Sequence, residues 1–162
     1  PCYKKDEDGS WKKSDVPFDE FHQPDALYEA GGAGLYSTVR DYLKFSQMLA
    51  NGGVYNGQRI IGRKTIDLMR TNQLNDQQLK DFNHNNVYLS GYGYGLGVRT
   101  LISNTDGNSN TSLGEFGWTG ALGTYVSIDP SEGFSVVYMH QTMPNMEAYH
   151  HLRVRSVAYG CL

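Results

Sequence analysis

The sequence predicts an α+β fold, in which an antiparallel sheet is covered by a C-terminal helix and preceded by a smaller region of helices and loops. Three observations predict it. One amphipathic segment near residues 38–50 has capping residues at both ends, alternating segments between residues 91 and 141 are separated by turns, and a second helical pattern closes the chain. We place the boundary between the helical and loop region and the sheet region at 1–90 and 91–162.

The segment over about 38–50 is predicted to be a helix. Thr38 and Asp41 have the spacing of a capping box, in which Asp41 is a cap and not a catalytic acid. Asn51-Gly52-Gly53 is typical of a left-handed C-terminal cap. The helix is expected to bury one stripe of six residues, in which Ser46 is the only polar member. The others are Val39, Tyr42, Leu43, Leu49 and Ala50.

The rest of the first region is punctuated by polar residues, glycine and proline. Residues 1–30 and 73–90 are predicted to be loops, and Lys64–Asn72 a shorter helix. Asp6 and Asp8 are interpreted as a solvated charge cluster, because the other positions of a calcium loop are missing. Cys2 and Cys161 are expected to be free thiols, with a bridge between the chain ends as the alternative.

The second region is predicted to be an antiparallel meander. Gly91 to about Ile102 is expected to form one strand, and Asn104–Asn108 a hairpin tip with Asp-Gly as the turn pair. Further strands are predicted at about 112–118, 121–129 and 133–141. The closing helix is expected to bury one stripe: Val154, Val157, Ala158 and Cys161.

The stretch Gly114–Pro130, GEFGWTGALGTYVSIDP, is the centre of the functional argument. Its strand alternates in period two, so one face carries Leu122, Thr124, Val126 and Ile128, and the other carries Gly123, Tyr125 and Ser127. Glycine recurs at 117, 120 and 123, where a ligand can approach the main chain closely.

Composition excludes several classes of function. The 162 residues carry a formal net charge of −3, so no basic footprint for nucleic acid is present. No apolar run reaches the about 20 residues of a membrane span. The sequence has no CxxC motif or Cys/His cluster for a metal. The five histidines, at 22, 84, 140, 150 and 151, have no carboxylate at a meaningful spacing and are interpreted as surface or structural residues.

Several stretches, in order, resemble the C-terminal half of serine β-lactamase-like hydrolases, the group of class C β-lactamases, carboxylesterases and D-stereospecific peptidases related to penicillin-binding proteins. The stretches are GGAGLYSTVRDYLKFSQMLANGG, RIIGRKTIDLMRTN, GYGYGLGVRT, FGWTGALGTYVSIDP and EGFSVVYMHQ. The resemblance covers roughly residues 25–160. It implies a partial β-lactamase/transpeptidase-like fold and acyl transfer through a nucleophilic serine, with no metal or cofactor.

By this resemblance Trp118-Thr119-Gly120 occupies the third active-site motif and binds substrate, and the backbone N–H of Ala121 is one oxyanion donor. Tryptophan cannot supply the charge of a lysine at the first position, which favours neutral esters or amides over efficient β-lactam hydrolysis. Packing at a sheet edge is the alternative role for Trp118, and an ordinary strand hydroxyl is the alternative for Thr119. Tyr92 and Tyr94 are either pocket or core residues.

The nucleophile and its base are missing from credible places in this chain. Ser10 and Lys13 satisfy Ser-x-x-Lys formally, in a charged segment on the wrong side of the family's order. We therefore expect a C-terminal fragment, inactive alone, of a serine hydrolase acting on a small ester or amide. Its expected partner is the N-terminal part of the same protein, or a second copy joined through an unpaired sheet edge. A non-catalytic binding or structural module is the alternative, and members of the group occur in several compartments.

Overall fold

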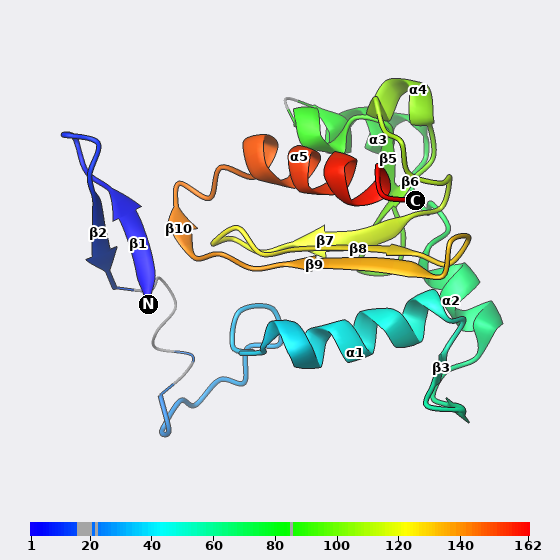
Figure 1. Cartoon of the computed structure of the whole chain (residues 1–162), viewed down its shortest axis with the longest axis horizontal. Helices are drawn as coiled ribbons and strands as arrows, with labels where there is room; N and C mark the ends of the chain where they lie inside the picture. Colours follow the sequence, from blue (N-terminus) through cyan, green and yellow to red (C-terminus); the bar gives the residue numbers. More distant parts are fainter. Residues whose placement is uncertain (16–20, 22, 85) are drawn as a thin grey trace.

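The computed structural model describes residues 1–15, 21, 23–84 and 86–162, so His22 and part of the predicted N-terminal loop lie outside the described residues. At its centre is a five-stranded antiparallel sheet with its strands in chain order. The strands are β5 (Tyr92–Tyr94), β6 (Arg99–Leu101), β7 (Phe116–Thr119), β8 (Tyr125–Asp129) and β9 (Phe134–Tyr138). Helix α1 (Val39–Ala50) covers one face and helix α5 (Glu147–Tyr159) covers the other (Figure 1). The predicted α+β fold is confirmed.

The caps of α1 are as predicted. The Thr38 side chain accepts a hydrogen bond from the backbone N–H of Asp41. At the other end, the N–H of Gly52 donates to Leu49 and the N–H of Gly53 donates to Met48, which is the Schellman arrangement. Gly52 and Gly53 have φ of 63° and 91°, a conformation that glycine adopts without strain.

Helix α1 buries only its C-terminal half. Met48, Leu49 and Ala50 pack in the core cluster with Phe116, Val126 and Ile128 of the sheet. Ser46 is also buried, and its hydroxyl lies 3.1 Å from that of Ser135 on β9. The predicted stripe was wrong at Val39 and Leu43, which are exposed, whereas Tyr42 in the same half of the helix packs against the core cluster.

The predicted stripe of α5 was also wrong. The helix buries His151, Arg155 and Tyr159, whereas Val157 and Cys161 are exposed. The reason is that the sheet face below α5 is polar. It carries Arg99, Glu115 and Ser127, and side chains four residues apart on the helix supply the hydrogen-bonding partners.

The predicted strand over residues 91–102 is in fact two antiparallel strands, β5 and β6. The chain reverses at Gly95, whose N–H donates to the carbonyl of Val98, and Gly97 has a φ of 79°. The predicted hairpin tip is instead a helical turn, α4 (Asn104–Gly107), which Ser103 caps through its side chain. The alternating glycines therefore belong to a tight turn between two strands and not to one continuous strand.

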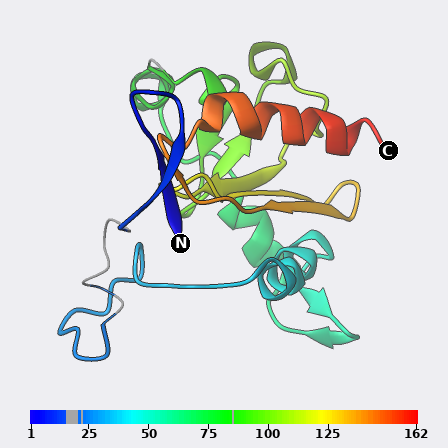
Figure 2. The same cartoon turned by 60° about the vertical axis from the view of Figure 1, so that its left-hand side comes forward.

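The predicted N-terminal loop contains a β-hairpin. Strand β1 (Cys2–Lys5) pairs with β2 (Trp11–Ser14) and also, in parallel, with β10 (Thr142–Met143), and the hairpin stands beside the main body (Figures 1 and 2). Gly9, with φ 84°, allows the tight turn. Cys2 is buried and Cys161 is exposed, and both are free thiols, as expected.

The predicted loop over residues 73–90 contains helix α3 (Asp76–Asn83) and a 3₁₀ turn (Val87–Leu89). The signal was a capping box, in which the side chains of Asn75 and Gln78 each bond the other's backbone N–H. Helix α2 (Arg63–Met69) and the short pair β3 (Val54–Tyr55) and β4 (Gln58–Arg59) complete the elements. In the described ranges, no helix has the length and apolar character to cross a membrane. The division at residue 90 stays a prediction.

Candidate functional site

The predicted third motif lies at the end of β7 and in the turn to β8. Trp118 and Thr119 are the last two residues of β7, and their register partners are Val126 and Tyr125. The N–H of Gly120 donates to the carbonyl of Thr124 at 2.8 Å, which closes the end of the strand pair. The chain therefore reverses directly after the motif.

The turn spans Gly120 to Gly123, with Ala121 and Leu122 at its centre. The N–H of Gly123 donates to the carbonyl of Gly120 at 2.9 Å, as in a β-turn. Neither central residue has a positive φ. A turn of this kind with negative φ at both central positions is type I.

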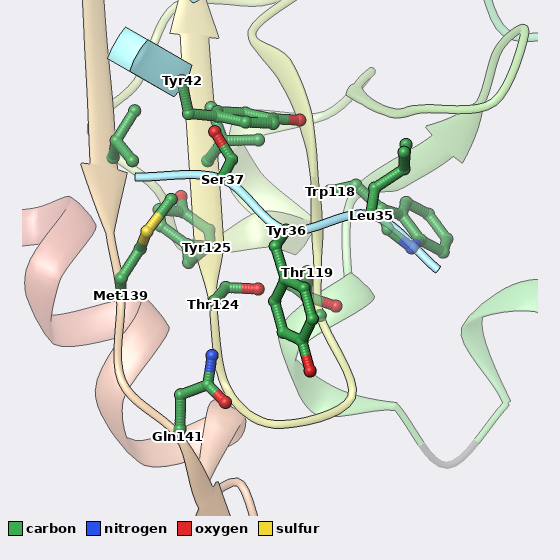
Figure 3. Close-up of a pocket in the computed structure, with 13 residues that line it drawn as sticks. Leu35, Tyr36, Ser37, Tyr42, Trp118, Thr119, Thr124, Tyr125, Met139 and Gln141 are labelled. Atoms are coloured by element: carbon green, nitrogen blue, oxygen red, sulfur yellow. The ribbon is translucent and has the colours of Figure 1, made fainter. Parts of the chain in front are cut away.

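Three motif residues, Trp118, Thr119 and Gly120, line a cleft of about 200 Å³ between β7–β9 and the segment before α1 (Figure 3). The remaining lining comes from Leu35, Tyr36, Ser37, Tyr42, Thr124, Tyr125, Val126, Val137, Met139 and Gln141. Among the described residues that line it, none is a lysine, arginine, aspartate or glutamate. The cleft therefore suits a neutral, partly apolar molecule.

The ring of Trp118 forms a flat wall of this cleft and contacts an aromatic residue that does not line the cleft. Its ring lies 5.3 Å from that of Tyr94 in an edge-to-face arrangement, and Tyr94 contacts Phe82 at 5.5 Å. Trp118 is 40% exposed. Tyr94 thus supports the wall without lining the cleft.

Ala121 lies next to the cleft and is not one of its lining residues. It is exposed, and its carbonyl accepts a hydrogen bond from the Asn145 side chain at 3.3 Å. In the described part of the chain, its backbone N–H has no acceptor. An N–H at this place is free to donate to a ligand oxygen.

Tyr92 belongs to a buried polar cluster beneath α5, and not to the cleft. Its hydroxyl donates to Glu115 at 2.6 Å and accepts from Arg155 at 2.6 Å. Burial first, and then the Glu115 carboxylate, raise the pKa of Tyr92 well above its usual value, so the hydroxyl stays protonated. Glu115 also accepts from Ser127 at 2.6 Å and from Arg99 at 3.4 Å.

The Ser10–Lys13 pair does not form a site. Ser10 lies in the exposed turn of the β1–β2 hairpin, and its hydroxyl donates to Asp8 at 2.6 Å. Asp6 pairs with Lys12 across the same hairpin. The interpretation of Asp6 and Asp8 as a solvated charge cluster agrees with these contacts.

Three of the histidines gather where α5 meets the β7–β8 turn. The rings of His140 and His150 lie 5.2 Å apart, and His151 stacks on Tyr125 at 4.9 Å. His151 is buried, and its Nε2 lies 2.9 Å from the carbonyl of Gly123. His84, by contrast, is exposed.

We predict that His151 makes the protein less stable in mild acid. Burial first lowers its pKa from the ordinary value of 6.5, opposed by the Gly123 hydrogen bond. The charged or titratable groups around it are Arg99 of β6, Tyr125 of β8, Tyr138 of β9, His140, and His150 on its own helix. The unfolded chain takes up the proton first. The stability from His151 is therefore full above pH 6.5 and is lost as the pH falls from there through the lower folded pKa.

The measurement is urea unfolding of wild type and His151→Gln across this pH range. The loss of unfolding free energy on acidification should be smaller in the variant. Equal pH dependence in the two proteins would contradict the assignment.

Sequence reasoning missed part of the cleft wall. Val137, Met139 and Gln141 line it from the strand predicted over 133–141, and their spacing of two residues was a usable signal. Leu35 and Tyr36 had no such signal, because they lie in an irregular segment before α1.

A family model described as Beta-lactamase matches residues 3–159. The chain belongs to the beta-lactamase family. Two Mycobacterium tuberculosis proteins are each 33% identical to this chain over 126 residues. They are the uncharacterized protein MT1414 (strain CDC 1551 / Oshkosh) and protein Rv1367c (strain ATCC 25618 / H37Rv). The match covers 76% of this chain and 31% of each relative. The beta-lactamase-family chain therefore spans about a third of the length of the curated relatives it matches.

Solved structures share the beta-lactamase-family fold. EstCE1, described as a hydrolase with promiscuous acyltransferase activity, superimposes with a TM-score of 0.77 at 22% identity, over 98% of this chain and 43% of its own. The simvastatin synthase LovD of Aspergillus terreus gives a TM-score of 0.75 at 19% identity, over 99% of this chain and 41% of its own. Both identities are low, so these likenesses show the fold.

Proposed function

We propose that this chain forms the third-motif half of a serine hydrolase that works by acyl transfer. The observation that carries the proposal is the placement of Trp118, Thr119 and Gly120 on one cleft, with the free N–H of Ala121 beside it. In this role the Ala121 N–H stabilises the oxyanion of the tetrahedral intermediate, and Thr119 bonds the substrate. The serine and its base come from polypeptide outside this chain.

The cleft favours neutral esters or amides as substrates. Its lining includes apolar side chains from both sides and no charged group among the described residues. A substrate carboxylate buried there would lack the cation that compensates its loss of hydration. Esterase or peptidase chemistry therefore fits the site better than efficient β-lactam hydrolysis.

The complementing polypeptide is proposed to cover the exposed apolar surface around the start of α1. Leu35, Val39, Leu43 and Phe45 are between 40% and 81% exposed there. Strand β9 is also an edge of the five-stranded sheet among the described strands, and its backbone is available for pairing. The N-terminal part of the same protein is the proposed occupant, and a homodimer through the edge is the alternative arrangement.

The test is an assay of the protein that contains both this chain and the polypeptide upstream of Pro1. We expect turnover of short-chain nitrophenyl esters, and labelling by a fluorophosphonate probe of a serine outside this chain. Turnover of a chromogenic cephalosporin should be slower. Trp118→Lys should shift the ratio toward the cephalosporin by about tenfold, since the new ammonium can bind the cephalosporin carboxylate.

Trp11→Lys is the matched control, because Trp11 is similarly exposed, at 49%, but lies on β2 outside the cleft lining. It should leave the ratio unchanged. Absence of both labelling and turnover in the complete protein would instead support a non-catalytic module with a hydrolase fold.

A further inference from the structure

His151 reaches the β7–β8 turn from the buried face of α5. It is 2% exposed, its ring stacks on Tyr125 with an interplanar angle of 29°, and its Nε2 lies 2.9 Å from the carbonyl oxygen of Gly123. A carbonyl only accepts, so Nε2 carries the hydrogen. Nδ1 is buried with no hydrogen-bond partner among the described residues, which is the arrangement of a neutral ring.

Two further donors bond carbonyls of the same turn. The N–H of Thr142 donates to the carbonyl of Leu122 at 3.0 Å, and the side chain of Asn145 donates to the carbonyl of Ala121 at 3.3 Å. Three successive carbonyls of the turn therefore accept from the chain segment that runs from β10 into α5.

His140 packs against Gly123 of the turn. Its Nε2 lies 2.9 Å from the carbonyl of Asn145, and a Cβ placed on Gly123 would lie only 2.0 Å from the same ring atom. Gly123 also has a φ of 103°. Glycine at this position thus lets the His140 ring approach the backbone of the turn.

These contacts connect His151 to the Ala121 N–H in two steps. His151 fixes the carbonyl of Gly123, and the N–H of Gly123 donates to the carbonyl of Gly120 at 2.9 Å. That carbonyl shares one planar peptide unit with the N–H of Ala121, so the orientation of one sets that of the other. Loss of the first contact would loosen the Gly123 end of the turn and so weaken the restraint on this peptide plane.

We propose that His151 is a positioning residue, which orients the Ala121 N–H toward the oxyanion by fixing Gly123 with a neutral Nε2–H. The inference rests on the proposed acyl-transfer function. It assigns His151 no contact with substrate and no proton transfer, and gives the histidine cluster a role in the geometry of the site.

The test compares two variants in the complete protein. His151→Phe keeps a ring that can stack on Tyr125 but removes the donor, and His151→Gln keeps an N–H donor near the position of Nε2. We expect His151→Phe to lower kcat for nitrophenyl esters about tenfold with little change in KM, and His151→Gln to recover most of the loss. A purely structural role would not produce this split or this rescue.

Amide hydrogen exchange provides a readout that does not depend on activity. The Gly123 N–H should exchange about tenfold faster in His151→Phe than in wild type, and near the wild-type rate in His151→Gln. If the complete wild-type protein shows no acyl transfer, the proposed function fails while this measurement still tests the contact. A folded His151→Phe with unchanged kcat, or unchanged Gly123 exchange, would overturn the inference, as would equal impairment of both variants.

Discussion

Replacing Ala121 with proline is expected to lower kcat for ester hydrolysis by the complete protein about 10²- to 10³-fold, with KM nearly unchanged. The substitution deletes the backbone N–H that we assign to the oxyanion. Proline is favoured at the second position of a type I turn, where Ala121 lies, so the turn itself should persist. The loss should therefore fall on the transition state and not on folding.

The control is Ala121→Ser, which retains the N–H at this exposed position and should keep kcat within about threefold of wild type. Steady-state kinetics with a nitrophenyl ester and a circular dichroism spectrum of each variant suffice. A folded Ala121→Pro enzyme with nearly wild-type kcat would remove Ala121 from the site.

Replacing Arg99 with methionine is expected to cost about 3–5 kcal/mol of unfolding free energy. Arg99 is 1% exposed, bonds Glu115 at 3.4 Å and the carbonyl of Val126 at 3.1 Å, and lies over the ring of Tyr125 at 4.9 Å. Its removal leaves a fully buried carboxylate without its cation. The midpoint of urea unfolding gives the effect.

Two comparisons separate lost charge from lost packing. Adding Glu115→Gln to Arg99→Met should restore part of the stability, because the uncompensated charge is then gone. Arg153→Met removes an exposed guanidinium over the ring of Tyr149 and should cost only about 0.5–1 kcal/mol. Similar losses in Arg99→Met and Arg153→Met would show that the buried pair contributes little.

Features determined by near neighbours in sequence were predictable. The caps of α1 depend on Thr38, Asp41 and two following glycines, all within one segment, and they were predicted correctly. The alternation was confirmed within β8, because Val126 packs toward α1 while Ser127 bonds Glu115 beneath α5. The predicted start of this strand at residue 121 was wrong, since residues 121–123 form the turn before β8. Period and capping are local properties, so they need no knowledge of the rest of the chain.

Features determined by distant residues were not predictable from local patterns. The buried face of α5 is chosen by side chains such as Arg99 and Glu115, which come from other strands, and an apolar stripe was the wrong criterion. The pairing of β1 with β10 joins opposite ends of the chain. In the candidate site, Trp118, Thr119 and Gly120 were named from the motif, whereas Leu35 and Tyr36 reach the same cleft only through tertiary packing.

The two faces of the sheet differ in how strictly they can define the position of a covering helix. Under α1 the contacts are mainly apolar, and such contacts tolerate small shifts. Under α5, Arg155 meets Tyr92, and Tyr159 lies 3.4 Å from the Ser127 hydroxyl. A slide of α5 by one residue would break every one of these pairs at once. These contacts therefore define a single alignment of the C-terminal helix on the sheet. A more hydrophobic replacement helix would still bind the sheet, but it would not define that alignment.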